Sequence, residues 1–82
     1  MTDDELIETA MTHARAIFKA TALTYDPGMV FQEIRGFDSV QAVQFVLALE
    51  EAFGVMLSEQ DIDDMRTMGD MLSTLRAKTG AG

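Results

Sequence analysis

The chain of 82 residues contains no cysteine. It therefore cannot form a disulfide, a thiolate zinc site or a thiol nucleophile of its own, and packing alone must hold its fold. A chain without cysteine is compatible with the reducing cytoplasm, which is where we expect this protein to be. Proline is almost as scarce, because the only one stands in Pro27-Gly28, a pair that marks a turn.

Basic residues are also few. Six Lys and Arg face fourteen Asp and Glu, which gives a formal charge of −8. A surface of this sign repels nucleic-acid phosphates and anionic lipid heads, so we expect neither nucleic acid nor membrane insertion but protein partners with basic surfaces. No apolar run approaches the about 18 residues of a membrane span. The acidic start, Thr2 to Glu5, also differs from the basic start of a signal peptide.

The size of the chain predicts one monomeric domain over residues 1–82 with a single core, since 48% of its residues are apolar. A domain this small buries only about 60–65% of its unfolded surface, which leaves little room for a deep water-free pocket. We therefore expect a protein that is not an enzyme.

Apolar residues recur every three or four positions over four stretches, which predicts an all-α fold. We expect a four-helix bundle with helices at about 3–20, 39–53, 59–65 and 68–78, the third being short. Residues 21–37 show no sustained period and predict a long loop between the first two helices. The helix starts carry residues at capping spacing: Thr2 with Glu5, Ser58 with Asp61, and Thr67 with Asp70. Asp38 and Ser39 open the second helix, and Gly54 closes it.

The second helix presents two different faces. One is an apolar stripe facing the core, formed by Ala42, Phe45, Val46, Leu49 and Phe53. The other mixes apolar side chains with carboxylates and predicts a docking surface: Ser39, Val40, Val43, Gln44, Leu47, Glu50 and Glu51.

A motif at the entrance to this helix carries the functional information. Gly36-Phe37-Asp38-Ser39-Val40 is followed within the helix by Leu47-Ala-Leu-Glu-Glu-Ala-Phe. In the order and spacing of these motifs the chain resembles the acyl carrier proteins, and the resemblance extends over nearly its whole length. The resemblance implies that a transferase attaches 4′-phosphopantetheine to Ser39, while Asp38 caps the helix and helps the transferase engage the serine. A phosphodiester at a helix start also suits the free amides and the positive end of the helix dipole.

The resemblance further implies a carrier that performs no chemistry itself. The arm would hold acyl intermediates as thioesters and present them at high effective concentration to partner enzymes. The expected partners are the phosphopantetheinyl transferase and acyl-loading, condensing or acyl-transfer enzymes with basic docking patches. They would contact Val40, Gln44, Leu47, Glu50 and Glu51.

The pathway is less sharply indicated. Gln41 and Gln44 stand where carriers of fatty-acid synthesis usually present acids, and Phe37 is similar to the Gly-Phe-Asp-Ser form of polyketide carrier domains. A fatty-acid, polyketide or other specialised acyl pathway therefore remains open. We expect the acyl chain to enter a space beside the second helix, bordered by Met29, Phe31, Val43, Val46, Leu47 and Met65.

Other interpretations rest on weaker patterns. Ser39 with His13 would suit a hydrolase only if an oxyanion-loop signature accompanied them, and none does. The acids Glu59, Asp61, Asp63 and Asp64 lack the mid-loop glycine of an EF-hand, so we expect a solvated helix face and no metal. An acidic four-helix interaction module that is never modified is the alternative that stays open.

Overall fold

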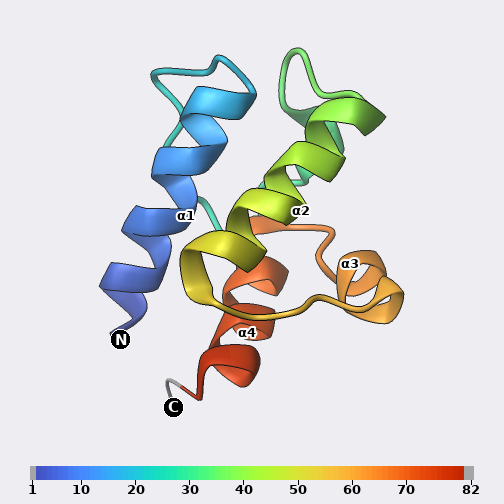
Figure 1. Ribbon diagram of the computed structural model, residues 1–82. Helices are drawn as coiled ribbons and strands as arrows, with labels where there is room; N and C mark the ends of the chain where they lie inside the picture. Colours follow the sequence, from blue (N-terminus) through green and yellow to red (C-terminus); the bar gives the residue numbers. More distant parts are fainter. Residues whose placement is uncertain (1, 81–82) are drawn as a thin grey trace.

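The computed structural model describes residues 2–80, and this part of the chain forms four helices: α1 (Asp3–Ile17), α2 (Ser39–Phe53), α3 (Glu59–Asp64) and α4 (Met68–Thr79) (Figure 1). The only β-type pairing within residues 2–80 is a single bridge between Val30 and Thr67. The predicted all-α, four-helix class is thus confirmed. Positions 1, 81 and 82 of the predicted domain lie outside the described residues. None of the helices in residues 2–80 is long and apolar enough to cross a membrane.

The core lies where α1, α2 and α4 meet. In Figure 1, α1 and α2 run side by side, and α4 crosses below them, while the short α3 lies to one side. The largest fully buried side chains come from the three long helices: Leu6, Met11, Leu49, Met68, Met71 and Leu75. Each such side chain contributes about 1.5–3 kcal/mol by its removal from water. Three of the six are methionines, whose flexible thioethers fill irregular gaps.

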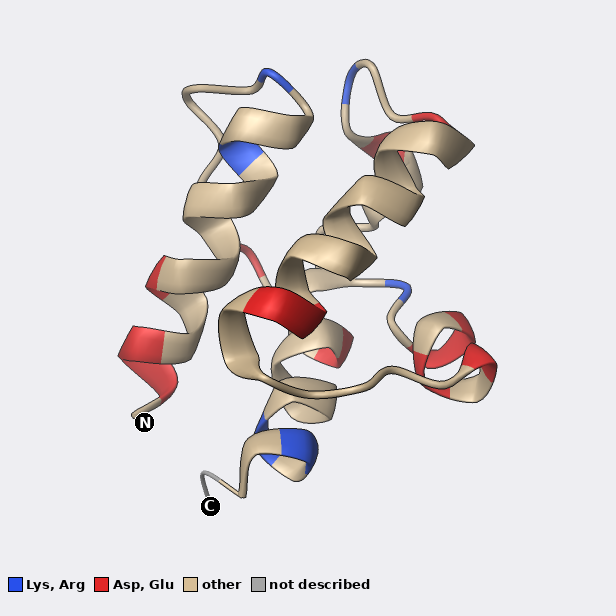
Figure 2. Ribbon diagram, viewed as in Figure 1, with Lys and Arg blue, Asp and Glu red and all other residues tan. Residues whose placement is uncertain are grey.

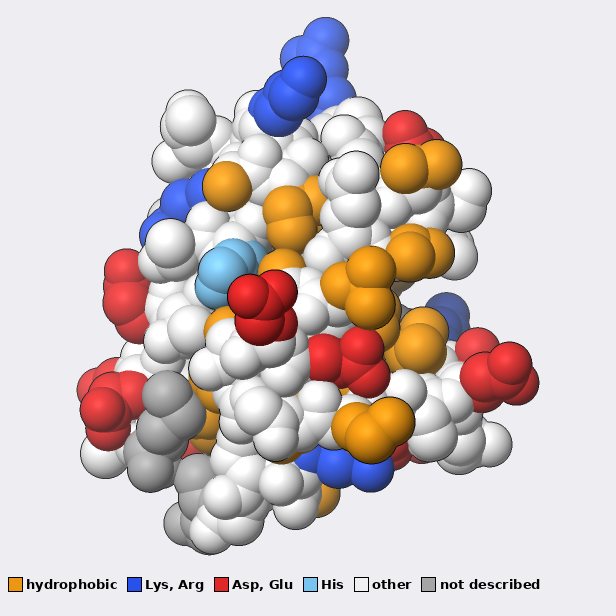
Figure 3. Space-filling view, in the orientation of Figure 1, with side chains coloured by type: hydrophobic (Ala, Val, Ile, Leu, Met, Phe, Trp, Pro, Cys, Tyr) orange, Lys and Arg blue, Asp and Glu red, His pale blue; other side chains and the backbone are white. Residues whose placement is uncertain are grey.

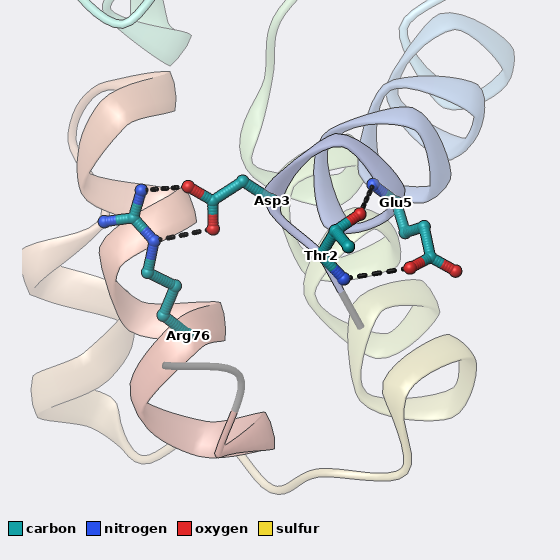
Figure 4. A network of polar contacts seen from close by, with 4 residues as sticks. All are labelled: Thr2, Asp3, Glu5 and Arg76. Carbon is teal, nitrogen blue, oxygen red and sulfur yellow. Dashed lines mark hydrogen bonds and ion pairs between the residues drawn. The ribbon is translucent and has the colours of Figure 1, made fainter.

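Side chains cap the helix starts as the sequence predicts. Thr2 accepts a hydrogen bond from the Glu5 amide, and the Glu5 carboxylate accepts one from the Thr2 amide (Figure 4). The same reciprocal bonds form at the starts of α3 and α4. These contacts satisfy amides that have no partner within the helix.

The first helix is shorter than the predicted range of about 3–20, because it ends at Ile17. The amide of Phe18 donates to the Ala14 carbonyl, and the amide of Ala20 donates to the Arg15 carbonyl. Lys19 takes the left-handed conformation that this ending requires, with φ of 54°. A glycine usually marks such an end, so a lysine there gave no signal in the sequence. The other ends differ less, since α3 stops at Asp64 and α4 at Thr79.

The loop between α1 and α2 is fastened to the start of α4. The Phe31 amide donates to the Arg66 carbonyl, the Met68 amide to Met29, and the Gly69 amide to Pro27. The loop also contains one 3-10 turn, Phe31–Glu33, which is too short to show a period in the sequence. These bonds place buried Phe31 and Ile34 against the core.

Ion pairs connect α1 and α3 to α4. Arg76 pairs with Asp3 of α1, and the Arg76 hydrogen bond lowers the pKa of Asp3 (Figure 4). The Lys78 ammonium lies 2.8 Å from the Asp61 carboxylate of α3. The hydrogen bond from Lys78 is the largest of several causes that lower the pKa of Asp61 to about 2. Because α3 has no buried residue, this pair is one of its few attachments.

The substitution Asp61→Asn should flatten the dependence of stability on pH between about pH 4 and pH 2. The folded chain holds the Asp61 carboxyl at a pKa of about 2, below the unfolded value. Its stabilisation is therefore complete above the unfolded pKa and is lost as the pH falls through the folded one. Melting temperatures measured from pH 6 to pH 2 would show a smaller fall for the variant. The difference should be modest because solvent screens an exposed pair.

Asp63→Asn is the matched control, since Asp63 is exposed on the same helix and forms no ion pair among the described residues. It should keep the pH profile of the wild type. Identical profiles for all three proteins would contradict a stabilising role for the pair between Asp61 and Lys78.

Candidate functional site

Ser39 is the first residue of α2, and its side chain is exposed. The preceding Asp38 is the helix cap, because its Oδ1 accepts the Gln41 amide at 2.8 Å. The serine hydroxyl is therefore not needed to begin the helix and faces solvent. It lies at the positive end of a fifteen-residue helix, where an attached anion is favoured.

A tight turn fixes the direction from which the chain enters α2. The Phe37 amide donates to the Ile34 carbonyl at 3.0 Å, and Gly36 has φ of 86°. These are features of a type II turn with Arg35 and Gly36 at its centre, a conformation that glycine adopts without strain. The Phe37 ring stacks on Phe18, with ring centroids 5.7 Å apart. The motif before Ser39 is thus anchored on both sides of the turn.

A cavity of about 280 Å³ lies beside α2. Its walls come from the end of α1, the long loop, α2 and the region of α3, and they are mostly apolar. The lining includes Phe18, Val30, Phe31, Phe37, Ala42, Phe45, Val46, Ile62 and Met65. The Phe45 ring lies 5.5 Å from both Phe18 and Phe31, so aromatic contacts shape the inner wall.

Phe31, Val46 and Met65 of the expected acyl-pocket residues lie in this lining. Val43 does not, because it is 57% exposed on the outer face of α2. Met29 lines a different hollow, beside the end of α1. Leu47 also faces outward. These three residues therefore do not border this cavity, because spacing along the chain does not show which face of α2 the loop covers.

Several lining residues were not among the expected ones, including Phe18, Phe37 and Ile62. They come from three separate segments that only the folded chain brings together. Phe45 also lines the cavity, and its inward position agrees with the sequence because it belongs to the apolar stripe expected to face the core.

The outer face of α2 carries exposed apolar side chains. Val40 and Leu47 are exposed there, together with the polar Gln44 and Glu51. Met56, in the segment after α2, is 84% exposed, and Ile62 of α3 is also exposed. Figure 3 shows hydrophobic side chains gathered on this side of the molecule, with acidic side chains beside them.

Glu50 differs from the other residues expected to dock. It is only partly exposed, and its Oε2 accepts the amide of Leu57 at 2.8 Å. Leu57 is buried, so this bond holds the segment that leads from α2 to α3 against the helix. The bond spans seven residues across the Gly54 turn, which helical spacing does not reveal. Glu50 therefore has a structural role in this fold.

Two of the four acidic residues of α3 are engaged with neighbouring groups. Asp61 bonds the Ser58 amide and Lys78, and Asp64 accepts the Gln60 side-chain amide at 2.9 Å. Within residues 2–80 the structure contains no group of three side chains that could hold a metal ion.

The motif before Ser39 lies inside a longer region of similarity. A family model described as the phosphopantetheine attachment site matches residues 15–75. The chain belongs to this family. The match includes the turn, Asp38, Ser39 and all of α2 and α3. Members of the family bear phosphopantetheine and are carriers, not enzymes, which confirms the resemblance to acyl carrier proteins.

Two curated relatives are similar over part of the chain. An acyl carrier protein of Prochlorococcus marinus is 38% identical over 50 residues, which cover 61% of this chain and 62% of the relative. A mitochondrial protein of Schizosaccharomyces pombe, provisionally named an acyl carrier protein, is 36% identical over 47 residues, which cover 57% of this chain and 42% of that protein. The similarity thus spans less than two thirds of either relative.

A solved structure shows the same fold. The chain of a candidate acyl carrier protein from Mycobacterium tuberculosis superposes with a TM-score of 0.78. The superposition covers 88% of this chain and 96% of that one, at 22% sequence identity. The four-helix arrangement described here is therefore that of a known fold.

The Leu57 amide is expected to lose its partner in Glu50→Ala. Leaving a partly buried amide without an acceptor should lower the free energy of unfolding by about 1–3 kcal/mol. Glu50→Gln retains an acceptor and should lose less. Urea unfolding of the variants measures the difference, and Glu51→Ala is the matched control because that neighbouring side chain is exposed. A loss in Glu51→Ala as large as that in Glu50→Ala would contradict the role of the bond.

Proposed function

We propose that this chain is an acyl carrier protein whose Ser39 hydroxyl bears 4′-phosphopantetheine through a phosphodiester. The observation that carries the proposal is the position of Ser39, exposed at the first residue of α2 within the family match. Asp38 already caps the helix, which leaves the serine oxygen available for modification. The arm supplies a thiol that forms thioesters with acyl groups, and the chain has no cysteine of its own.

The outer face of α2 is proposed to receive the partner enzymes. Val40 and Leu47 offer apolar contacts, while Gln44 and Glu51 surround them with polar and negative groups. This pattern suits a partner with an apolar hollow edged by Lys or Arg, such as a phosphopantetheinyl transferase or an acyl-loading, condensing or acyl-transfer enzyme. The net charge of −8 would add long-range attraction to such a surface.

The pathway is proposed only as a class: fatty-acid, polyketide or another specialised acyl pathway, served by a monomeric, cytoplasmic carrier. The feature that favours a specialised branch is the less acidic start of α2, where Gln41 and Gln44 stand. One of them is used by the fold, since the Gln41 side-chain amide donates to the Ile17 carbonyl at 3.4 Å.

The cavity beside α2 is proposed to shelter the first carbons of the acyl chain. Its apolar walls include Phe31, Val46 and Met65, and it lies along the helix that begins at Ser39. Each buried methylene contributes about 0.8 kcal/mol, so a chain of several carbons gains more than a short or polar cargo.

Ser39→Ala should abolish attachment of the arm while leaving the fold intact, because Asp38 still caps α2. Intact-protein mass after co-expression with a broad-specificity transferase measures the gain of one phosphopantetheine. Ser73→Ala, at an exposed position on α4, is the matched control and should be modified like the wild type. A mass gain in Ser39→Ala would move the site elsewhere. No gain in the wild type would favour the unmodified acidic interaction module.

Acyl chains of increasing length on the arm should move the methyl NMR signals of Val46 and Met65 progressively, because both line the cavity. Val43 and Met29 are internal controls, since neither contributes to its lining. Their signals should change little with chain length. Spectra that stay the same for every chain, or equal shifts at all four positions, would contradict sequestration in this cavity.

A further inference from the structure

Three of the six basic residues have no acidic partner, although the chain is strongly acidic. The others pair with acids of the same or another helix: Arg15 with Glu8, Arg76 with Asp3, and Lys78 with Asp61. Within residues 2–80, Lys19, Arg35 and Arg66 form no ion pair. Two of these cations, Lys19 and Arg35, line one hollow, and Figure 2 shows basic residues in the loops at the end of the molecule where α2 begins.

Arg35 is held at the tip of the turn that leads to Ser39. Ile34 on one side is buried, and Phe37 on the other stacks on Phe18. Ser39 follows Arg35 by four positions along the chain, a length of at most about 14 Å when extended. The bond from the Phe37 amide to the Ile34 carbonyl shortens this path. An exposed arginine side chain on such a turn can reach toward a group attached to the serine.

Lys19 approaches the same region from the end of α1. The Gln41 side-chain amide bonds the Ile17 carbonyl, which ties the end of α1 to the first turn of α2. A Cβ atom at Gly36 would lie 3.9 Å from the Phe18 carbonyl oxygen, so the turn lies against the same end. Lys19 and Arg35 accordingly line one hollow, and Figure 3 shows basic side chains together at this end.

The start of α2 favours a phosphodiester on Ser39, but Asp38 makes these surroundings less favourable than a helix start alone. Asp38, its direct neighbour, contributes a carboxylate that already occupies the Gln41 amide. The helix start therefore offers the phosphate one amide fewer, and the carboxylate repels it. An arginine can donate two hydrogen bonds to phosphate oxygens at once, and it thereby replaces the amide that the Asp38 carboxylate occupies. Glu33 lines the same hollow but forms no ion pair with either cation in the described structure.

We propose that Arg35, with Lys19 beside it, binds the phosphodiester that joins the pantetheine arm to Ser39. This inference rests on the proposed modification of Ser39. Arg35 is then a positioning residue that directs the base of the arm from a fixed turn. The contact does not take part in thioester chemistry, and it operates only once the arm is attached.

The test uses the modified protein and its phosphorus-31 NMR signal. In the wild type, attachment of the arm should shift the Arg35 Nε–H resonance, and the shift should shrink as salt screens the contact. Arg35→Gln should move the phosphorus signal and sharpen it as the arm base becomes more mobile, and Lys19→Gln should do so to a lesser degree. Arg66→Gln, compared in the protein whose arm carries no acyl group, is the matched control, because Arg66 also forms no ion pair within residues 2–80 but does not line the hollow of Lys19 and Arg35. Its phosphorus signal should remain that of the wild type.

Two failures can be told apart. A wild-type chain whose mass never increases overturns the proposed function, and this inference with it. A modified chain whose phosphorus signal is the same in the wild type, Arg35→Gln and Lys19→Gln overturns this inference alone, as does an equal change in Arg66→Gln. Melting curves of the unmodified variants confirm that each one is folded before the comparison is made.

Discussion

Contacts among four phenylalanine rings join the end of α1, the long loop and α2. Phe18 packs on Phe37 and Phe45, and Phe45 packs on Phe31. Such pairs add about 0.5–1.5 kcal/mol each beyond the burial of their area. The same rings hold the turn before Ser39 in place and form the inner wall of the cavity. The proposed attachment position at Ser39 and the proposed acyl cavity therefore depend on one set of packing contacts.

The opposite wall of the cavity is held more weakly. Ile62 lies on α3, which has no buried residue, and Met65 directly follows that helix. The attachments of α3 include the ion pair of Asp61 with Lys78 and the bond of Glu50 to the Leu57 amide. Both are polar contacts near the surface, where local opening costs least. The wall on the side of α3 is therefore less firmly held than the inner wall formed by the phenylalanine rings.

Charge is distributed unevenly over the molecule. Figure 2 shows acids at the start of α1, on α3 and near the end of α2, while the end at which α2 begins carries both acids and, in the adjoining loops, basic residues. In this chain of net charge −8, the basic residues of these loops and the outer face of α2 are proposed to serve two separate tasks. The acidic and apolar face of α2 suits partner enzymes, and the basic turn suits the phosphate of the arm.

Four helices, their capping residues and an exposed serine after Asp38 can be predicted from the sequence alone. These features arise from groups within three or four residues of one another, so spacing alone predicts them. The folded structure shows where α1 ends, that the Glu50 carboxylate accepts the Leu57 amide, and that Val43 and Met29 lie outside the cavity. It also brought Lys19 close to Arg35. Each of these depends on how the loop and the turn after α2 pack against the helices, and contacts between distant segments leave no periodic pattern in the chain.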